Sequence, residues 1–183
     1  MEHDHYDDGY IRAILASVRT FAMVGASPNP VRPSYFVMKY LLAKGYDVIP
    51  INPGQAGAEI LGRRCYARLA DAPAPVDVVD IFRNSEAALG VTRDAIALKD
   101  KLGLKAIWMQ LTVRNDEAAR LAEAAGLTVV MNRCPKIEFG RLSGEIGWSG
   151  VNSGVVSSRR PLMADKGVQN RKLASTQPKP ENP

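Results

Sequence analysis

Residues 21–30 read FAMVGASPNP, so a short apolar run ends in a turn of small residues, prolines and an asparagine. An amphipathic helix is expected to follow this turn and to begin near Ser34. A turn of small residues lets the backbone approach an anion closely, and the helix after it offers unpaired N–H groups and the positive end of its dipole. A strand, turn and helix in this order predict a phosphate-binding turn in an α/β protein.

Apolar runs recur along the chain with helical stretches between them, which is the pattern of βαβ units and a parallel sheet. The runs contain Val, Ile and Met without polar alternation, as expected for strands that are covered on both faces. Strands are predicted at residues 20–24, 47–51, 77–82, 106–109 and 128–131. The predicted fold class is therefore α/β: a Rossmann-like, doubly wound, mainly parallel five-stranded sheet with helices on both faces.

The intervening helices carry capping signals at their ends. Asparagines precede two of them, and glycines that can adopt a left-handed conformation follow three. Helices are predicted near residues 10–18, 34–44, 84–103 and 115–126, with a short helix near 68–72 inside the long connection 54–75.

The chain has 183 residues, of which 46% are apolar, which is enough for one domain with a sizeable core. The net charge is +5, but most of it follows residue 150, where six Lys or Arg face two acidic residues. We therefore predict a folded domain at residues 1–161 and a basic, disordered tail at 162–183. The tail has no interleaved aromatic residues, so no nucleic-acid partner is expected.

The composition also bears on location and covalent chemistry. No apolar run approaches the roughly 20 residues that span a bilayer, and the chain starts with acidic residues rather than a basic secretion signal. We expect a cytoplasmic protein without a membrane partner. Its two cysteines, Cys65 and Cys134, are too few and too far apart to suggest a disulfide framework or a zinc site.

Doubly wound proteins bind ligands beyond the carboxyl ends of their parallel strands. Gly25 would allow the tight first turn there, Ser27 could offer a hydroxyl and an N–H group, and Arg32 could add a charge-assisted contact. The alternative is an ordinary strand-to-helix turn in which Ser34 only caps the helix. Phe82 and the guanidinium that follows it could flank a flat ligand, or Phe82 could belong to the core.

The sequence lacks the motifs of several known binding sites. The dinucleotide pattern Gly-x-Gly-x-x-Gly is absent, and no acid follows the second strand to bind a ribose diol, which argues against NAD. No Gly-Lys-Ser/Thr follows the turn, so it is not a P-loop. The two histidines, His3 and His5, lie in an N-terminal segment expected to be mobile, so we expect no histidine in the core and no metal site.

Cys134 is the candidate reactive group, because Arg133 and Lys136 beside it could lower the pKa of its thiol. The alternative is an inert, semi-buried thiol. Among the acidic residues, Asp80 is expected to serve structure or hydrogen bonding, and Glu138 and Glu145 have no evident partner in the sequence.

Six motifs in register carry a family resemblance. They are VGASPNP at 24–30, RPSY at 32–35, GYDVIPINP at 45–53, PVDVVDIFR at 75–83, IWMQL at 107–111 and NRCPKIE at 132–138. Together they resemble the small bacterial and archaeal CoA-binding proteins over roughly residues 10–142. Those proteins are similar to the Rossmann-like CoA-binding domain of the succinyl-CoA synthetase alpha subunit.

The resemblance implies a protein that binds CoA or an acyl-CoA. Gly25, Ala26 and Ser27 would contact the CoA phosphates. From the place of Cys134 at the same strand ends, we add the hypothesis that its thiol faces the CoA thiol and forms a mixed disulfide with it under oxidation. The other implied contacts are Asn52, Pro53, Phe82 and Arg83 around the nucleotide portion and Gln110 towards the pantetheine arm.

The synthetase's phosphohistidine-bearing second domain has no counterpart here, so ligase activity is not implied and no catalytic residue is assigned. Three alternatives stay open: an NAD-dependent oxidoreductase, an acyl-CoA-processing enzyme that needs a partner, and an interaction module whose basic tail recruits an acidic partner. The oligomeric state is not fixed by the sequence.

Overall fold

The computed structural model describes residues 2–145 and 172–173. In these residues, five parallel strands form one sheet in the order β2-β1-β5-β6-β7. The strands are β1 (Thr20–Val24), β2 (Asp47–Ile51), β5 (Val78–Ile81), β6 (Ala106–Met109) and β7 (Thr128–Val130). Each predicted strand is present, with bounds that agree to within one residue at either end.

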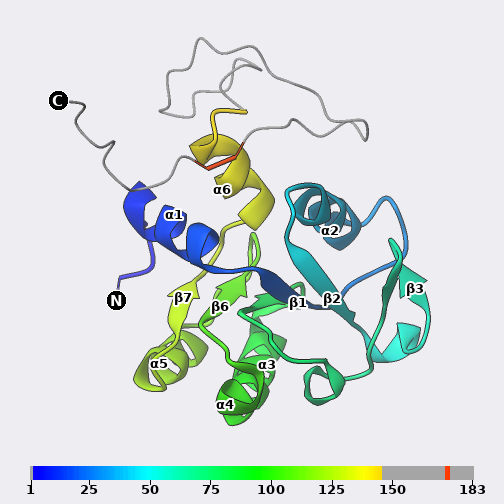
Figure 1. Ribbon diagram of the computed structural model, residues 1–183. Coiled ribbons are helices and arrows are strands. Elements are labelled where there is room, and N and C mark those ends of the chain that lie inside the picture. The colour runs from blue at the N-terminus through cyan, green and yellow to red at the C-terminus, as the bar shows by residue number, and fades with distance from the viewer. Residues whose placement is uncertain (1, 146–171, 174–183) are drawn as a thin grey trace, which may run out of the picture.

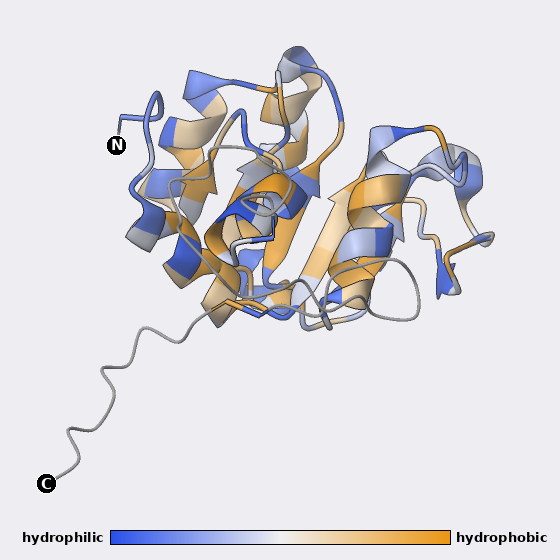
Figure 2. Ribbon diagram, turned by 90° about the horizontal axis from the view of Figure 1, so that it is seen from above, coloured by the Kyte–Doolittle hydropathy of each residue, from blue (hydrophilic) through white to orange (hydrophobic). Residues whose placement is uncertain are grey.

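Helices cover both faces of the sheet, as predicted (Figure 1). One face carries α1 (Asp8–Ser17), α2 (Pro33–Ala43) and α6 (Pro135–Leu142); the other carries α3 (Ser85–Ala97), α4 (Lys99–Leu102) and α5 (Asp116–Ala124). Each helical layer packs on an apolar cluster of its own. Figure 2 shows the consequence, with hydrophobic residues along the strands and hydrophilic ones on the outer sides of the helices.

The long connection after β2 is more structured than the sequence suggested. It contains η1 (Pro53–Gln55), η2 (Leu69–Asp71) and an antiparallel hairpin of β3 (Glu59–Ile60) and β4 (Arg63–Arg64). Helix α6 was also not predicted. It starts with a proline, whose fixed φ suits a first helical position, directly after β7 and its loop.

The strand order creates one crevice at the carboxyl edge of the sheet. Numbered along the chain, the five parallel strands of the described residues lie in the order 2-1-3-4-5. Helix α2 leaves β1 towards one face, whereas α3 leaves the neighbouring β5 towards the other (Figure 1). The loops after β1 and β5 therefore diverge, and such a switch point is where open α/β sheets bind ligands.

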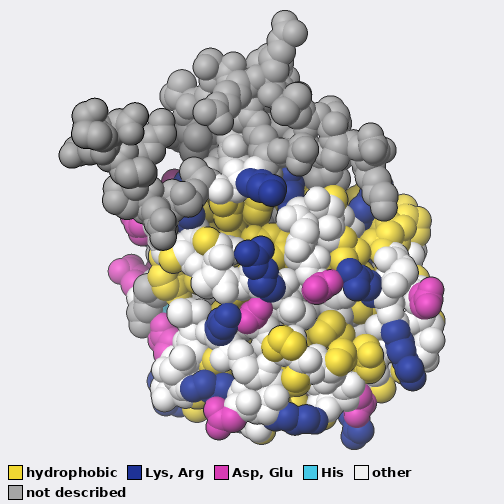
Figure 3. All heavy atoms as spheres, viewed as in Figure 1, with side chains coloured by type: hydrophobic (Ala, Val, Ile, Leu, Met, Phe, Trp, Pro, Cys, Tyr) yellow, Lys and Arg dark blue, Asp and Glu magenta, His cyan; other side chains and the backbone are white. Residues whose placement is uncertain are grey.

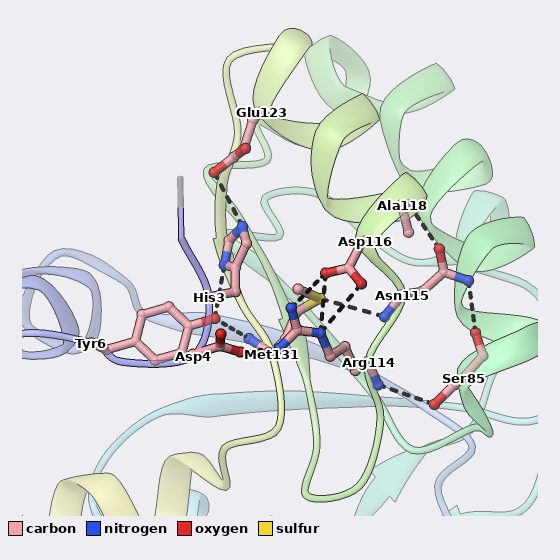
Figure 4. Close-up of polar contacts among 10 residues, drawn as sticks. All are labelled: His3, Asp4, Tyr6, Ser85, Arg114, Asn115, Asp116, Ala118, Glu123 and Met131. Atoms are coloured by element: carbon pink, nitrogen blue, oxygen red, sulfur yellow. Dashed lines mark hydrogen bonds and ion pairs between the residues drawn. The ribbon is translucent and has the colours of Figure 1, made fainter.

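The N-terminal segment protects the free edge of β7. The Tyr10 hydroxyl donates to the carbonyl oxygen of Val129 (3.0 Å) and accepts from its N–H group (3.2 Å). The Tyr6 hydroxyl accepts from the N–H group of Met131 (2.7 Å), as Figure 4 shows. Side-chain hydroxyls thus satisfy backbone groups that would otherwise invite pairing with another strand.

The expectation of a mobile N-terminus is wrong for its described residues. His3 is buried, with Nδ1 2.8 Å from the Tyr6 hydroxyl and Nε2 3.3 Å from Glu123 (Figure 4). Burial lowers the pKa of His3. Asp4 forms an ion pair with Arg114. The segment therefore belongs to the folded body, although His3 lies against α5 rather than at the carboxyl edge of β1 and β5.

We expect the Tyr10→Phe variant to lose about 1–3 kcal/mol of unfolding free energy, because the buried N–H and carbonyl groups of Val129 lose their partner. Urea unfolding followed by circular dichroism measures the change. Tyr35→Phe is the matched control, because Tyr35 lies on α2, which packs against β2 at the opposite edge of the sheet. Equal losses in the two variants would contradict the protective role of Tyr10.

Two acidic residues that lacked an evident partner have one in the fold. Glu138 accepts hydrogen bonds from Arg141 (2.8 Å). Glu145 accepts from the buried Tyr40 hydroxyl (2.6 Å) and forms an ion pair with Lys44. The first contact lies within α6, whereas those of Glu145 join α2 and its C-cap to the chain that follows α6.

The predicted tail and the residues that connect it to the domain fall mostly outside the described residues. Of the pair that is described, Lys172 is exposed and Leu173 packs against the apolar cluster beneath α1, α2 and α6. In the described residues no helix combines the length and apolar character of a membrane span. On the face in Figure 3, Lys and Arg side chains are dispersed among acidic and neutral ones rather than gathered in a stripe.

Candidate functional site

The turn after β1 is held between the ends of its two neighbouring strands. The N–H group of Gly25 donates to the carbonyl of Ile51 (2.9 Å), and that of Phe82 donates to the carbonyl of Val24 (2.8 Å). Gly25 has φ +94°, and a Cβ atom there would lie 2.5 Å from the carbonyl oxygen of Phe82. Only glycine combines this conformation with such a close approach.

Asn52 and Ala26 shape the turn from behind. Asn52 Nδ2 donates to the carbonyl of Ala26 (2.7 Å), while its Oδ1 accepts from the N–H group of Gly54 (2.9 Å). Ala26 is buried. Both polar atoms of the Asn52 side chain are therefore used within the protein, and neither residue lines the two cavities described next.

A cavity of about 790 Å³, here called the main cavity, lies along the carboxyl ends of β1, β5 and β6. Eight of the predicted site residues line it: Gly25, Ser27, Arg32, Ser34, Phe82, Arg83, Gln110 and Cys134. Asn84, Leu111 and Thr112 also line it, as expected of residues that follow the strand ends, although no contact was assigned to them. The remaining lining residues, to which no binding role was assigned, are Pro33, Val37, Ser85 and Val113. Most of them follow strand ends or start helices. A search of all residues beyond the carboxyl ends of the parallel strands could therefore have found most of them.

Several helices begin at the main cavity. Helix α2 has Arg32 at its N-cap and α6 has Cys134, and neither side chain caps its helix, whereas Asn84 caps α3 by accepting from Ala87 (2.9 Å). Ser34 is therefore not the cap of α2; it lies buried in the first turn and faces the cavity. Helix N-termini without a side-chain cap favour an anionic ligand.

A smaller cavity of about 200 Å³, here called the side cavity, lies beyond β1 and β2. Its lining is largely apolar, with Val24, Ile51, Pro53, Ala67, Leu69 and Val91 beside Arg68 and Asp94. Gly25 and Arg83 line both cavities. The turn at Gly25 therefore lies between the small, largely apolar side cavity and the main cavity, and a long ligand could extend from one to the other.

Asp80 lies beneath the main cavity and is fully buried in the centre of β5. Gln110 Nε2 donates to its Oδ1 (2.8 Å), and within the described part of the chain Oδ2 has no hydrogen-bond partner. Burial raises the pKa of Asp80 to about 8, against the opposing effect of the Gln110 hydrogen bond. The sequence signal was a single carboxylate in an otherwise apolar strand, which we had assigned only to hydrogen bonding.

The environment of Cys134 differs from the one expected. Burial is the largest effect on this thiol and raises its pKa, while hydrogen bonds from the N–H groups of Ile137 and Lys136 and the charge of Lys136 lower it by less. The cationic groups themselves lie near aromatic rings: the Arg133 guanidinium is 5.5 Å from the Tyr6 ring centre, and Lys136 Nζ is 5.9 Å from the Tyr40 ring centre. Cys134 is therefore a protonated, nearly buried thiol at neutral pH.

The described residues contain no cluster of three or more His, Cys, Asp or Glu that could bind a metal ion. The side chains that line the main cavity include two arginines, three serines, a threonine, two amides and a thiol. These groups suit the binding of a phosphorylated molecule.

Comparison with known proteins gives consistent matches. The family model described as a CoA binding domain matches residues 19–140. An uncharacterized protein of Bacillus subtilis, YneT, is 33% identical over 127 residues, which cover 69% of this chain and 90% of that protein.

Solved structures agree with these matches. Prb, a redesign of the PH1109 protein for binding, has 44% identity and a TM-score of 0.71, with coverage of 77% of this chain and 95% of its own. A dinucleotide-forming acetyl-coenzyme A synthetase of Ca. Korarchaeum cryptofilum, solved with phosphate and ADP, has 31% identity and a TM-score of 0.52 over 62% of this chain. This match spans 25% of the synthetase chain.

Proposed function

The chain belongs to the family of CoA-binding domains, and from that premise we propose that it binds coenzyme A or an acyl-CoA across the carboxyl ends of β1 and β5. The observation that carries this proposal is that the main and side cavities share Gly25 and Arg83. A CoA molecule has a flat nucleotide base, a group of phosphates and a long arm. The side cavity, the shared turn and the main cavity offer matching surroundings in the same order.

In this arrangement the base enters the side cavity, whose apolar lining and Arg68 suit a flat ring. The phosphates lie at the turn, where Ser27 and the N-terminus of α2 can donate hydrogen bonds and Arg32 and Arg83 add charge. The pantetheine arm follows the main cavity towards Gln110 and Cys134.

A second candidate is an acyl-CoA-processing enzyme that needs a partner protein. It is favoured by the likeness of this chain to one quarter of a much longer acetyl-CoA synthetase. An NAD-dependent oxidoreductase has no such support, because the position that would hold a carboxylate after β2 is Asn52, whose amide is engaged by the turn. Calorimetry with CoA, acetyl-CoA and NAD in parallel separates these ligands, and a preference for NAD would overturn the proposal.

We expect Arg83→Gln to weaken CoA binding about 10- to 100-fold, since a hydrogen bond to a charged group contributes about 1.5–3 kcal/mol. Titration calorimetry at fixed ionic strength measures the dissociation constant. Arg93→Gln is the matched control, because it removes the same charge from an exposed residue of α3 that pairs with Glu117 and lines neither cavity. An equal loss in both variants would mean that only the overall charge of the protein matters.

A further inference from the structure

The large exposed apolar side chains of the described residues lie on the segment before α2, on α2 itself, after β6 and on α6. Among the described residues, four large apolar side chains are well exposed: Val31, Phe36, Leu111 and Ile137. Single exposed apolar residues are common and need no explanation, whereas a contiguous group indicates a binding surface.

One of the four lines the main cavity, and the other three are close in the sequence to residues that line it. Leu111 is part of its lining. Ile137 follows Cys134 by three residues at the start of α6, so both lie on one side of that helix. Phe36 lies one turn after the lining residue Pro33 on α2, and Val31 precedes the lining residue Arg32. We call these four residues the apolar rim.

The apolar rim lies on elements that pack against each other. Helices α2 and α6 are in contact, with the Tyr40 and Phe139 rings 6.0 Å apart. Lys136, beside Ile137, approaches the Tyr40 ring, and Tyr40 is one turn after Phe36. Phe36 and Ile137 therefore belong to one surface at the mouth of the cavity, on the same side as Cys134.

We infer that the ligand is a CoA thioester with a hydrocarbon acyl chain, whose chain lies against the apolar rim. The inference rests on the proposed function, because it takes the CoA phosphates to lie at the Gly25 turn. The arm of CoA then carries its sulfur towards Cys134, and an acyl group beyond that sulfur meets the apolar rim.

The groups beneath this end of the cavity support a neutral acyl group over a carboxylate-bearing one. Burial raises the pKa of Asp80 to about 8, which favours its uncharged form at neutral pH, and among the described residues its buried Oδ2 atom has no hydrogen-bond partner. Gln110 is engaged by Asp80, and the Cys134 thiol is protonated. None of these side chains offers a cation to a second carboxylate. The N-terminus of α6 favours an anion at this end, so tighter binding of succinyl-CoA than of octanoyl-CoA would overturn the inference.

The test compares the dissociation constants of CoA, acetyl-CoA, succinyl-CoA and octanoyl-CoA by calorimetry on the full chain. A fully buried methylene contributes about 0.8 kcal/mol, which is about fourfold in affinity. Because the rim is open to solvent on one side, we expect octanoyl-CoA to bind at least about tenfold more tightly than acetyl-CoA. Equal affinities for CoA and octanoyl-CoA would overturn the inference and leave the proposed function intact.

Variants test whether the tighter binding of octanoyl-CoA depends on the apolar rim. In the double variant Phe36→Ser with Ile137→Ser, we expect the ratio of octanoyl-CoA to CoA affinity to fall to about threefold or less. Leu121→Ser, which changes a half-buried leucine of α5 outside the cavity, should keep the wild-type ratio. An unchanged ratio in the double variant, with a change in sedimentation mass, would make the rim a contact between copies of the chain and the inference wrong. If CoA itself fails to bind wild type, both the proposed function and the inference fail.

Discussion

Replacing Gly25 with alanine is expected to abolish measurable CoA binding and to destabilise the fold by about 2–5 kcal/mol. Two effects add at this position. The φ of +94° disfavours any side chain, and the new Cβ would lie 2.5 Å from the carbonyl oxygen of Phe82. Since that carbonyl belongs to the loop after β5, relieving the clash must separate the β1 and β5 loops between which the phosphates are proposed to lie. Denaturant unfolding and calorimetry with CoA measure the two losses separately.

Gly45→Ala is the matched control for this experiment. Gly45 ends α2 with a similar φ of +87°, but a Cβ there meets no atom within 4 Å. Alanine at Gly45 should therefore cost about 1 kcal/mol of stability and leave CoA affinity unchanged. If Gly25→Ala behaves like Gly45→Ala in both measurements, the close approach of the two loops has no role in binding.

The sheet could be predicted from the sequence because its strands are buried on both faces. Runs such as 106–109 contain apolar residues on consecutive positions, and no helix of the same length would bury all of them. The sequence of helix α6 contains no comparable pattern from which the helix could be predicted. It is short, starts directly after a strand and loop, and contains a glycine, so its stability comes from packing against α1 and α2.

Some residues of the candidate site could be predicted from the positions of the strands alone. The carboxyl ends of parallel strands meet at one edge, so residues such as Ser27, Phe82 and Gln110 could be grouped without knowing the strand order. The roles of other residues depended on three-dimensional contacts. The amide of Asn52 turns towards Ala26, and the cations beside Cys134 turn towards aromatic rings. Local sequence does not determine which way such long or branched side chains point.

The Asp80→Asn variant is expected to be more stable than wild type at pH 7, by about 3–4 kcal/mol, and equally stable near pH 4. Burial raises the pKa of Asp80 from 3.8 to about 8 in the folded protein. Between these values the folded state keeps a proton that the unfolded state has released, so the stability of wild type falls as pH rises. The fall is about 1.4 kcal/mol per pH unit and ends above the folded pKa.

Asparagine removes this dependence while it keeps the shape of the site. Its Oδ1 can still accept from Gln110 Nε2, and its second polar atom replaces an oxygen that has no partner in wild type. Urea unfolding of both proteins from pH 4 to pH 8 gives the difference between their unfolding free energies at each pH. Other titrating groups, such as His3, contribute equally to both proteins and cancel in this difference. Parallel pH profiles would show that Asp80 is ionised in the folded protein. Diverging profiles would instead establish a neutral acid under the main cavity, which is the environment that an uncharged acyl group requires.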